Sequence, residues 1–105
     1  MQSSYVFIID SMRVLIMNVS YIAHISGKVQ GVFFRASSQQ QAIEYGLSGY
    51  ARNLADGEVE VLMCGEQQNV DKMLEWLSHG PPQAVVEDVK SKQVPWQDHN
   101  HFSIS

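Results

Sequence analysis

The chain has 105 residues, of which 45% are hydrophobic and 17% are charged, and these proportions fit one globular domain. Its formal net charge is -4, which argues against a nucleic-acid-binding protein, because such proteins present a basic face to phosphates. A single cysteine, Cys64, excludes an internal disulfide bond and suits a reducing compartment, so a cytoplasmic location is predicted.

The first 18 residues differ in pattern from the rest of the chain. Two apolar runs, residues 5–9 and 14–17, are separated by Asp10 and Arg13, and neither approaches the roughly 20 apolar residues that a membrane helix needs. A signal peptide requires a positive charge before its apolar run, and no positive charge precedes residues 5–9. We therefore predict an extension outside the compact fold, residues 1–18, followed by one domain, residues 19–105. An added strand or a crystal contact is the alternative.

The rest of the chain alternates between strand and helix patterns. Apolar residues at every second position predict strands, and apolar residues three and four positions apart predict helices. Gly46 is placed to end the first helix, and Asp56-Gly57 predicts a hairpin turn. In chain order, we expect strands over residues 21–26 (beginning near Val19), 47–52, 59–63, 84–94 and 102–104, with helices over residues 34–45 and 70–77.

The region around the second helix carries the most regular pattern in the sequence. Its apolar residues recur at helical spacing, and Gly80-Pro81-Pro82 ends it. Asn69 is expected to cap its start, because asparagine accepts hydrogen bonds from free N–H groups there. Gly65 and Glu66 are expected to end the strand before it. Three glutamates are expected on a solvated edge: Glu58, Glu60 and Glu66.

This order of elements predicts an α+β fold. A β-α-β-β-α-β sequence with a short edge strand corresponds to a ferredoxin-like split βαβ two-layer sandwich, with a mostly antiparallel sheet and two helices on one face. Such a fold also hosts RNA-binding and small-ligand regulatory domains, so a binding module is the alternative. An RNA binder needs exposed aromatic residues within a basic surface. The first strand offers Tyr21, Ile22 and His24 without a basic companion, which disfavours that alternative.

The segment between the first strand and the first helix has the features of an anion site. Gly27 and Gly31 allow the backbone to turn so that successive N–H groups point inward, and the start of the helix adds positive potential. Arg35 falls in the first helical turn, from which its planar guanidinium can bind two phosphate oxygens side by side. A strand-loop-helix with two glycines is also often a simple turn, so the pattern alone leaves both interpretations open.

The residue identities in this segment point to its function more specifically than its strand-loop-helix arrangement does. Residues 27–35, Gly-Lys-Val-Gln-Gly-Val-Phe-Phe-Arg, resemble the signature of the acylphosphatase family, which reads glycine, any residue, Val-Gln-Gly-Val, any residue, Phe-Arg. Residues 46–53 resemble the second segment of that family, which ends in an asparagine. Asn53 follows Arg35 by 18 positions, similar to the family spacing. The resemblance covers residues 19–104.

The resemblance implies hydrolysis of a small acyl phosphate to a carboxylate and inorganic phosphate, with no metal and no other cofactor. It implies that Arg35 binds the substrate phosphate and that Asn53 orients the attacking water. The remaining phosphate oxygens are expected at the backbone amides of Val29, Gln30, Gly31, Val32, Phe33 and Phe34. Two alternatives remain: a catalytically silent member of the family, and a turn role for Asn53, because asparagine suits hairpin turns.

Metal binding is not expected from the sequence. His99 and His101 stand at a spacing that metal sites use, but the surrounding stretch is polar and offers no third ligand. We therefore expect both to be solvated histidines. Nor do we expect a nucleic acid or a membrane as a partner.

Overall fold

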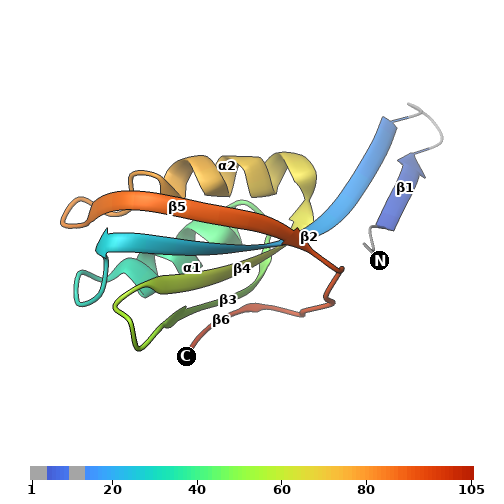
Figure 1. Ribbon diagram of the computed structural model, residues 1–105. Helices are drawn as coiled ribbons and strands as arrows, with labels where there is room; N and C mark the ends of the chain where they lie inside the picture. Colours follow the sequence, from blue (N-terminus) through green and yellow to red (C-terminus); the bar gives the residue numbers. More distant parts are fainter. Residues whose placement is uncertain (1–4, 10–13) are drawn as a thin grey trace.

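The computed structural model describes residues 5–9 and 14–105, with side chains from Met17 onward. Within this part of the chain, strands and helices form a two-layer sandwich (Figure 1). In chain order, the elements are β1 (Tyr5–Ile9), β2 (Val14–Lys28), α1 (Phe34–Glu44), β3 (Ser48–Asn53), β4 (Val59–Glu66), α2 (Gln67–Leu77), β5 (Val85–Val94) and β6 (Phe102–Ile104).

The strands form one sheet in the order β5-β2-β4-β3-β6, and β1 pairs with the first residues of β2. Every pairing is antiparallel except that of β3 with β6, which is parallel. Both helices cover the same face of the sheet (Figure 1). The predicted α+β ferredoxin-like sandwich is therefore confirmed. Neither described helix has the length and hydrophobicity needed to span a bilayer.

The hydrophobic core lies between the helices and the sheet. The apolar stripe predicted for α2 is buried there. The first helix, α1, has few apolar residues and buries only a narrow line at four-residue spacing, Phe34, Ser38 and Ala42. The Ser38 hydroxyl donates to the Phe34 carbonyl at 2.7 Å, so its burial leaves no polar atom unpaired. The ring of Phe34 packs against Trp76 of α2, which fixes the end of α1 that begins beside the glycine-containing loop.

Strand β2 begins earlier than predicted, at Val14 rather than near Val19. Its apolar start pairs with β1, from Tyr5 opposite Asn18 to Ile9 opposite Val14. Figure 1 shows this hairpin extending beyond the helices. The prediction was wrong at this boundary because pairing with β1, and not the alternation of residues 21–26, sets where β2 starts.

Strand β4 also differs from the prediction, because it continues through Gly65 and Glu66. Gly65 pairs with Val19 of β2, so pairing across the sheet outweighs the low strand preference of glycine. Helix α2 follows at once. Asn69 therefore lies inside α2, where its side-chain amide donates to the Glu66 carboxylate at 3.1 Å instead of capping the helix.

The sheet face opposite the helices contains a buried carboxylate, Glu60, which the sequence placed on a solvated edge. Glu60 is only 7% exposed. It bonds to one side chain on each neighbouring strand, His24 of β2 and Arg52 of β3, both at 2.8 Å, and accepts from the Tyr50 hydroxyl at 2.7 Å. His24 and Arg52 stand directly opposite Glu60 in the sheet register. The expectation for Glu60 was wrong because neighbouring strands enclose a polar residue of a central strand.

These contacts change the acidity of two groups. Burial opposes ionisation of Glu60, but the hydrogen bonds from His24, Tyr50 and Arg52 outweigh burial and hold its pKa below the ordinary value of 4.5. Burial, together with the hydrogen bond to Glu60, raises the pKa of Tyr50 to about 12. The cluster therefore contains an ionised carboxylate and a protonated tyrosine at neutral pH.

We expect Glu60→Gln to reduce the sensitivity of the fold to acid. Because the pKa of Glu60 is lowered on folding, the unfolded chain binds more protons in acid than the folded chain does. The stability due to Glu60 is complete above pH 4.5 and is lost as the pH falls below that value. Glu60→Gln should remove this part of the pH slope and lower the free energy of unfolding at neutral pH by about 1–3 kcal/mol.

Urea unfolding of both proteins from about pH 3 to about pH 7 measures this difference. Glu58→Gln is the matched control, since it neutralises a neighbouring glutamate that lies outside the cluster. An unchanged acid slope in Glu60→Gln would contradict the assignment.

Candidate active site

The loop between β2 and α1 forms a cradle of backbone N–H groups. Gly31 has φ 76° and Phe33 has φ 60°, while Val32 between them has no positive φ. Such alternation of backbone handedness turns successive N–H groups to one side, which makes a concavity that binds anions. Among the described residues, no backbone carbonyl accepts a hydrogen bond from the N–H groups of residues 31–35. These donors are therefore free for an anion.

The two glycines of the segment have different roles. Gly31 lies in the cradle, where a left-handed φ favours glycine. Gly27 lies within β2, at the point where its register with β5 shifts. A Cβ atom at Gly27 would collide with the Val85 carbonyl, so glycine is required there by the close approach of β5. The expectation that both glycines shape the cradle was therefore wrong for Gly27.

The left-handed conformation of Phe33 is unusual for a residue with a side chain. Among the described residues, Phe33 is the one non-glycine residue with a positive φ, and such a conformation costs about 1–2 kcal/mol. Phe33 stands at the N-cap of α1, which begins at Phe34. The strain is offset by the buried Phe34 side chain, which is 2% exposed and anchors the helix start in the core.

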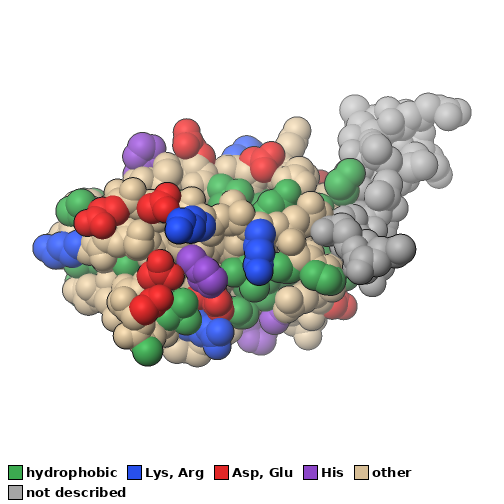
Figure 2. Space-filling model, viewed as in Figure 1, with side chains coloured by type: hydrophobic (Ala, Val, Ile, Leu, Met, Phe, Trp, Pro, Cys, Tyr) green, Lys and Arg blue, Asp and Glu red, His purple; other side chains and the backbone are tan. Residues whose placement is uncertain are grey.

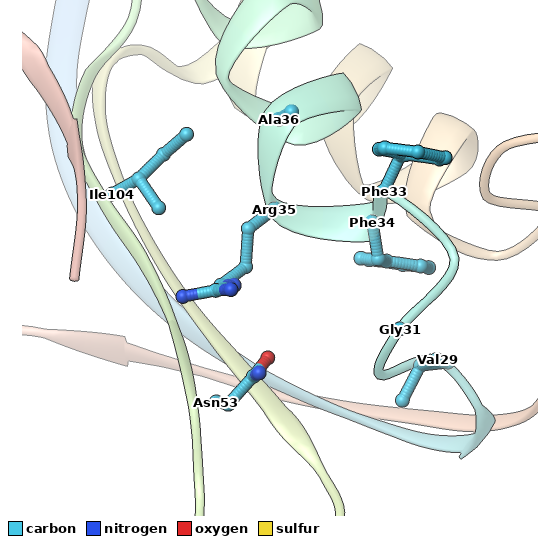
Figure 3. A pocket seen from close by; sticks show the side chains of 8 residues that line it. All are labelled: Val29, Gly31, Phe33, Phe34, Arg35, Ala36, Asn53 and Ile104. Carbon is cyan, nitrogen blue, oxygen red and sulfur yellow. The ribbon is translucent and has the colours of Figure 1, made fainter.

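Arg35 is the second residue of α1, as the sequence predicts. Figure 3 shows its guanidinium lying above Asn53, beside the space that the loop encloses. Arg35 Nη1 donates to the backbone oxygen of Ser105 at 2.7 Å. This contact holds the arginine on the β6 side of the site and leaves its other N–H groups available to a ligand.

Asn53 is the last residue of β3, where it pairs with Val59 of β4. It shares a sheet face with the buried Ala51, so its side chain lies on the same side of the sheet as the helices. Figure 3 shows the amide directed toward Arg35. The turn itself follows: the Leu54 N–H donates to the Glu58 carbonyl at 2.8 Å. Asn53 therefore has a strand conformation and precedes the turn.

The Gln30 side chain connects the cradle to this turn. Its amide nitrogen donates to the Leu54 carbonyl at 2.9 Å and to the Glu58 carbonyl at 3.0 Å. The loop that carries the N–H groups is thereby fixed against the segment that follows Asn53. From the sequence, only the backbone amide of Gln30 was predicted to take part in the site. The contact of its side chain with the turn was missed because the partners are 24 and 28 positions away in the sequence.

A cavity of about 360 Å³ brings most of the predicted site residues together. Two residues of the predicted set do not line it: Val32 is buried, and the Gln30 side chain is directed to the turn. Ile104, for which the sequence predicted no site role, is part of the wall. The lining residues are Val29, Gly31, Phe33, Phe34, Arg35, Ala36, Asn53 and Ile104 (Figure 3).

Metal ligands do not gather near this cavity. Among residues 17–105, no three His, Cys, Asp or Glu side chains are placed to hold a metal ion together. The functional groups of the site are backbone amides, one guanidinium and one carboxamide. They can bind a phosphoryl group and orient a small neutral molecule beside it.

These features define the chain as an α+β domain with one cavity between the loop, α1 and the sheet whose groups are suited to bind a phosphoryl group. The acylphosphatase family model matches residues 21–104. The acylphosphatase of Colwellia psychrerythraea is 73% identical over 88 residues, which are 84% of this chain and 99% of that protein. The chain belongs to the acylphosphatase family.

Two solved structures agree with this assignment. An acylphosphatase from Coxiella burnetii superposes with a TM-score of 0.82 at 40% identity, covering 84% of this chain and 93% of that one. The crystal structure of acylphosphatase from Bacillus subtilis superposes with a TM-score of 0.80 at 32% identity, covering 83% and 98%. The predicted family and fold are therefore confirmed.

Proposed function

We propose that this chain hydrolyses acyl phosphates to a carboxylate and inorganic phosphate, using no metal or other cofactor. One observation carries the proposal: a single cavity is lined by residues of the loop, by Arg35 and by Asn53 in a chain of the acylphosphatase family. We assign phosphate binding to Arg35 and to the backbone of residues 29–34, and orientation of the attacking water to Asn53.

Binding of the phosphoryl group is electrostatic. We expect the free N–H groups of the loop to donate to the phosphoryl oxygens, while the start of α1 adds a positive partial charge and Arg35 supplies a full one. These donors are fixed before the substrate arrives, because Gln30 and Phe34 anchor the loop at both ends. Preorganised donors of this kind stabilise the charge that develops on the phosphoryl oxygens in the transition state.

The reaction requires little acid or base from the protein. Water forms a new bond to phosphorus, the bond from phosphorus to the acyl oxygen breaks, and its electron pair leaves with the carboxylate. A carboxylate is a good leaving group and needs no proton from the protein. The proton of the water passes to a phosphate oxygen, since the Asn53 amide is not a base. Asn53 accepts a hydrogen bond from the water through its oxygen and so aims it at phosphorus.

Phosphate release from acyl phosphates and from phosphate monoesters tests the proposed reaction. We expect acetyl, carbamoyl and benzoyl phosphates to be hydrolysed and the monoesters to be hydrolysed far more slowly, because an alkoxide leaves less readily than a carboxylate. Activity should be unchanged in excess EDTA. Equal turnover of both classes would contradict the reaction class, and a loss restored by Mg²⁺ or Zn²⁺ would contradict the mechanism.

We also propose that residues 19–105 form the functional domain and that residues 1–18 are an extension to it. The family model begins at residue 21, and 84% of this chain matches nearly all of the Colwellia relative. A cytoplasmic location is proposed because Cys64 is a buried free thiol, which suits a reducing compartment.

A further inference from the structure

The cluster of polar side chains around Glu60 lies at the end of β3 that carries Asn53. Arg52 stands opposite Glu60 in the sheet, and the next pair along is Asn53 with Val59. Successive side chains of a strand point to opposite faces, so Arg52 faces away from the helices while Asn53 lines the cavity. Figure 2 shows the face that bears Arg52, where basic, acidic and histidine side chains adjoin one another over the strands. The cluster therefore contacts β3 directly behind Asn53.

The position of the Asn53 amide depends on how the end of β3 is held. Among residues 17–105, no side chain or backbone group forms a hydrogen bond with this amide. Asn53 is also the last residue of β3, and the ends of elements open most easily. On the cavity side, Gln30 holds the turn that follows. On the opposite face, Arg52 Nε donates to the Glu60 carboxylate at 2.8 Å and holds the residue that precedes Asn53.

Stability alone does not account for a carboxylate at this position. A buried carboxylate loses its hydration, and an apolar side chain of similar size often stabilises a protein as much or more. This face accepts such a side chain, because Leu62, the next residue of β4 on the same side of the sheet, is fully buried. Glu60 instead accepts hydrogen bonds from Tyr50 and Arg52, which both belong to the strand of Asn53. Directional bonds of this kind fix a strand more exactly in place than an apolar contact does.

We propose that Glu60 and Arg52 are positioning residues for the hydrolysis: their ion pair holds the end of β3 so that the Asn53 amide stays aimed at the attacking water. This role rests on the proposed function and on the role assigned there to Asn53. Neither Glu60 nor Arg52 lines the cavity, so neither contacts the substrate. Without the pair, Asn53 shifts, and a misplacement of about 1 Å can cost roughly 10²-fold in rate. Phosphate binding by the loop and Arg35 is retained.

The test separates turnover from phosphate affinity in variants of the pair. Arg52→Met removes the guanidinium and retains an unbranched side chain, and it should fold because Arg52 is half exposed. We expect kcat to fall about 10–100-fold, while phosphate affinity, measured by calorimetric titration, stays unchanged. Arg52→Lys retains a cation that can bind Glu60 and should restore most of kcat. Glu60→Gln keeps only one of the two acceptor oxygens and should lower kcat in the same direction as Arg52→Met.

His24→Gln is the matched control, because His24 bonds to the same carboxylate from β2 and not from β3. It should lower the melting temperature and retain kcat, since the bonds from β3 to Glu60 remain. A double-mutant cycle with Asn53→Ala gives a second control. In the Asn53→Ala protein, Arg52→Met should cost little further turnover, because the amide that Arg52 positions is absent.

A spectroscopic measurement separates this proposal from the proposed function. The NMR signals of the Asn53 side-chain amide, recorded with bound inorganic phosphate, report its placement without any turnover. They should shift or broaden in Arg52→Met and stay unchanged in His24→Gln. Unchanged kcat in both Arg52→Met and Glu60→Gln would overturn the positioning role, as would an equal loss of kcat in His24→Gln or a loss of phosphate affinity that matches the loss of kcat. Absence of wild-type turnover, with the NMR difference intact, would instead contradict the proposed function.

Discussion

Arg35→Ala should lose both affinity for phosphate and turnover. We assign to Arg35 two hydrogen bonds to the phosphoryl group, made in the ground state and strengthened in the transition state. Hydrogen bonds to a charged group contribute about 1.5–3 kcal/mol each, so kcat/KM should fall roughly 10²–10⁴-fold. Inorganic phosphate should no longer inhibit at modest concentrations. Arg35→Lys should restore little, because an ammonium group lacks the planar pair of donors.

The contact of Arg35 with Ser105 calls for a control. Arg35 ties α1 to the end of the described chain, so part of any loss could come from movement of β6. Gln39 makes a similar tie: its amide nitrogen donates to the Phe102 carbonyl of β6 at 2.8 Å, but it does not line the cavity. Gln39→Ala should therefore retain phosphate affinity. Equal losses in Arg35→Ala and Gln39→Ala would show that the position of β6, and not the guanidinium, carries the effect.

The elements of this fold could be predicted from local pattern because most of them have regular periodicity and clear stops. The apolar stripe of α2 and the alternation of β4 are explicit in the sequence. Arg35 and Asn53 could be found because both belong to short segments with family-specific letters. Each segment is local, so no long-range information is needed to place Arg35 in the first turn of α1 or Asn53 before the hairpin turn.

Several of the missed features depend on pairing between segments that are remote in the sequence. Glu60 looks like a solvated residue in its own strand, and only the neighbouring β2 and β3 bring His24 and Arg52 against it. The continuation of β4 through Gly65 depends on β2 in the same way. Ile104 reaches the cavity because β6 pairs in parallel with β3, a neighbour that periodicity does not specify.

Asn53→Ala should lower turnover and leave phosphate affinity nearly unchanged. Arg35 and the loop contact the phosphoryl group in both ground and transition states, whereas Asn53 is assigned to the attacking water alone. An interaction made only on the way to the transition state affects kcat and not ground-state binding. We expect kcat to fall by about 10²–10³, as when one preorganised group is removed elsewhere. Calorimetric titration with phosphate, together with steady-state rates, measures the two quantities separately.

Two further variants isolate the role of the Asn53 amide. Asn53→Asp retains the size of the side chain but places a negative charge beside the phosphoryl group, so it should weaken phosphate binding as well as turnover. Asp56→Ala tests the turn, because the Asp56 carboxylate accepts a hydrogen bond from the Glu58 N–H at 2.9 Å. Asp56 does not line the cavity, so the substitution leaves the cavity wall unchanged. It should lower the melting temperature while retaining kcat. If Asn53→Ala is folded and fully active, the water is oriented by another group. If Asp56→Ala loses as much turnover as Asn53→Ala does, the integrity of the turn explains the loss. Because Asn53 ends a paired strand before the turn begins, we expect the two variants to separate, with turnover lost in Asn53→Ala and stability lost in Asp56→Ala.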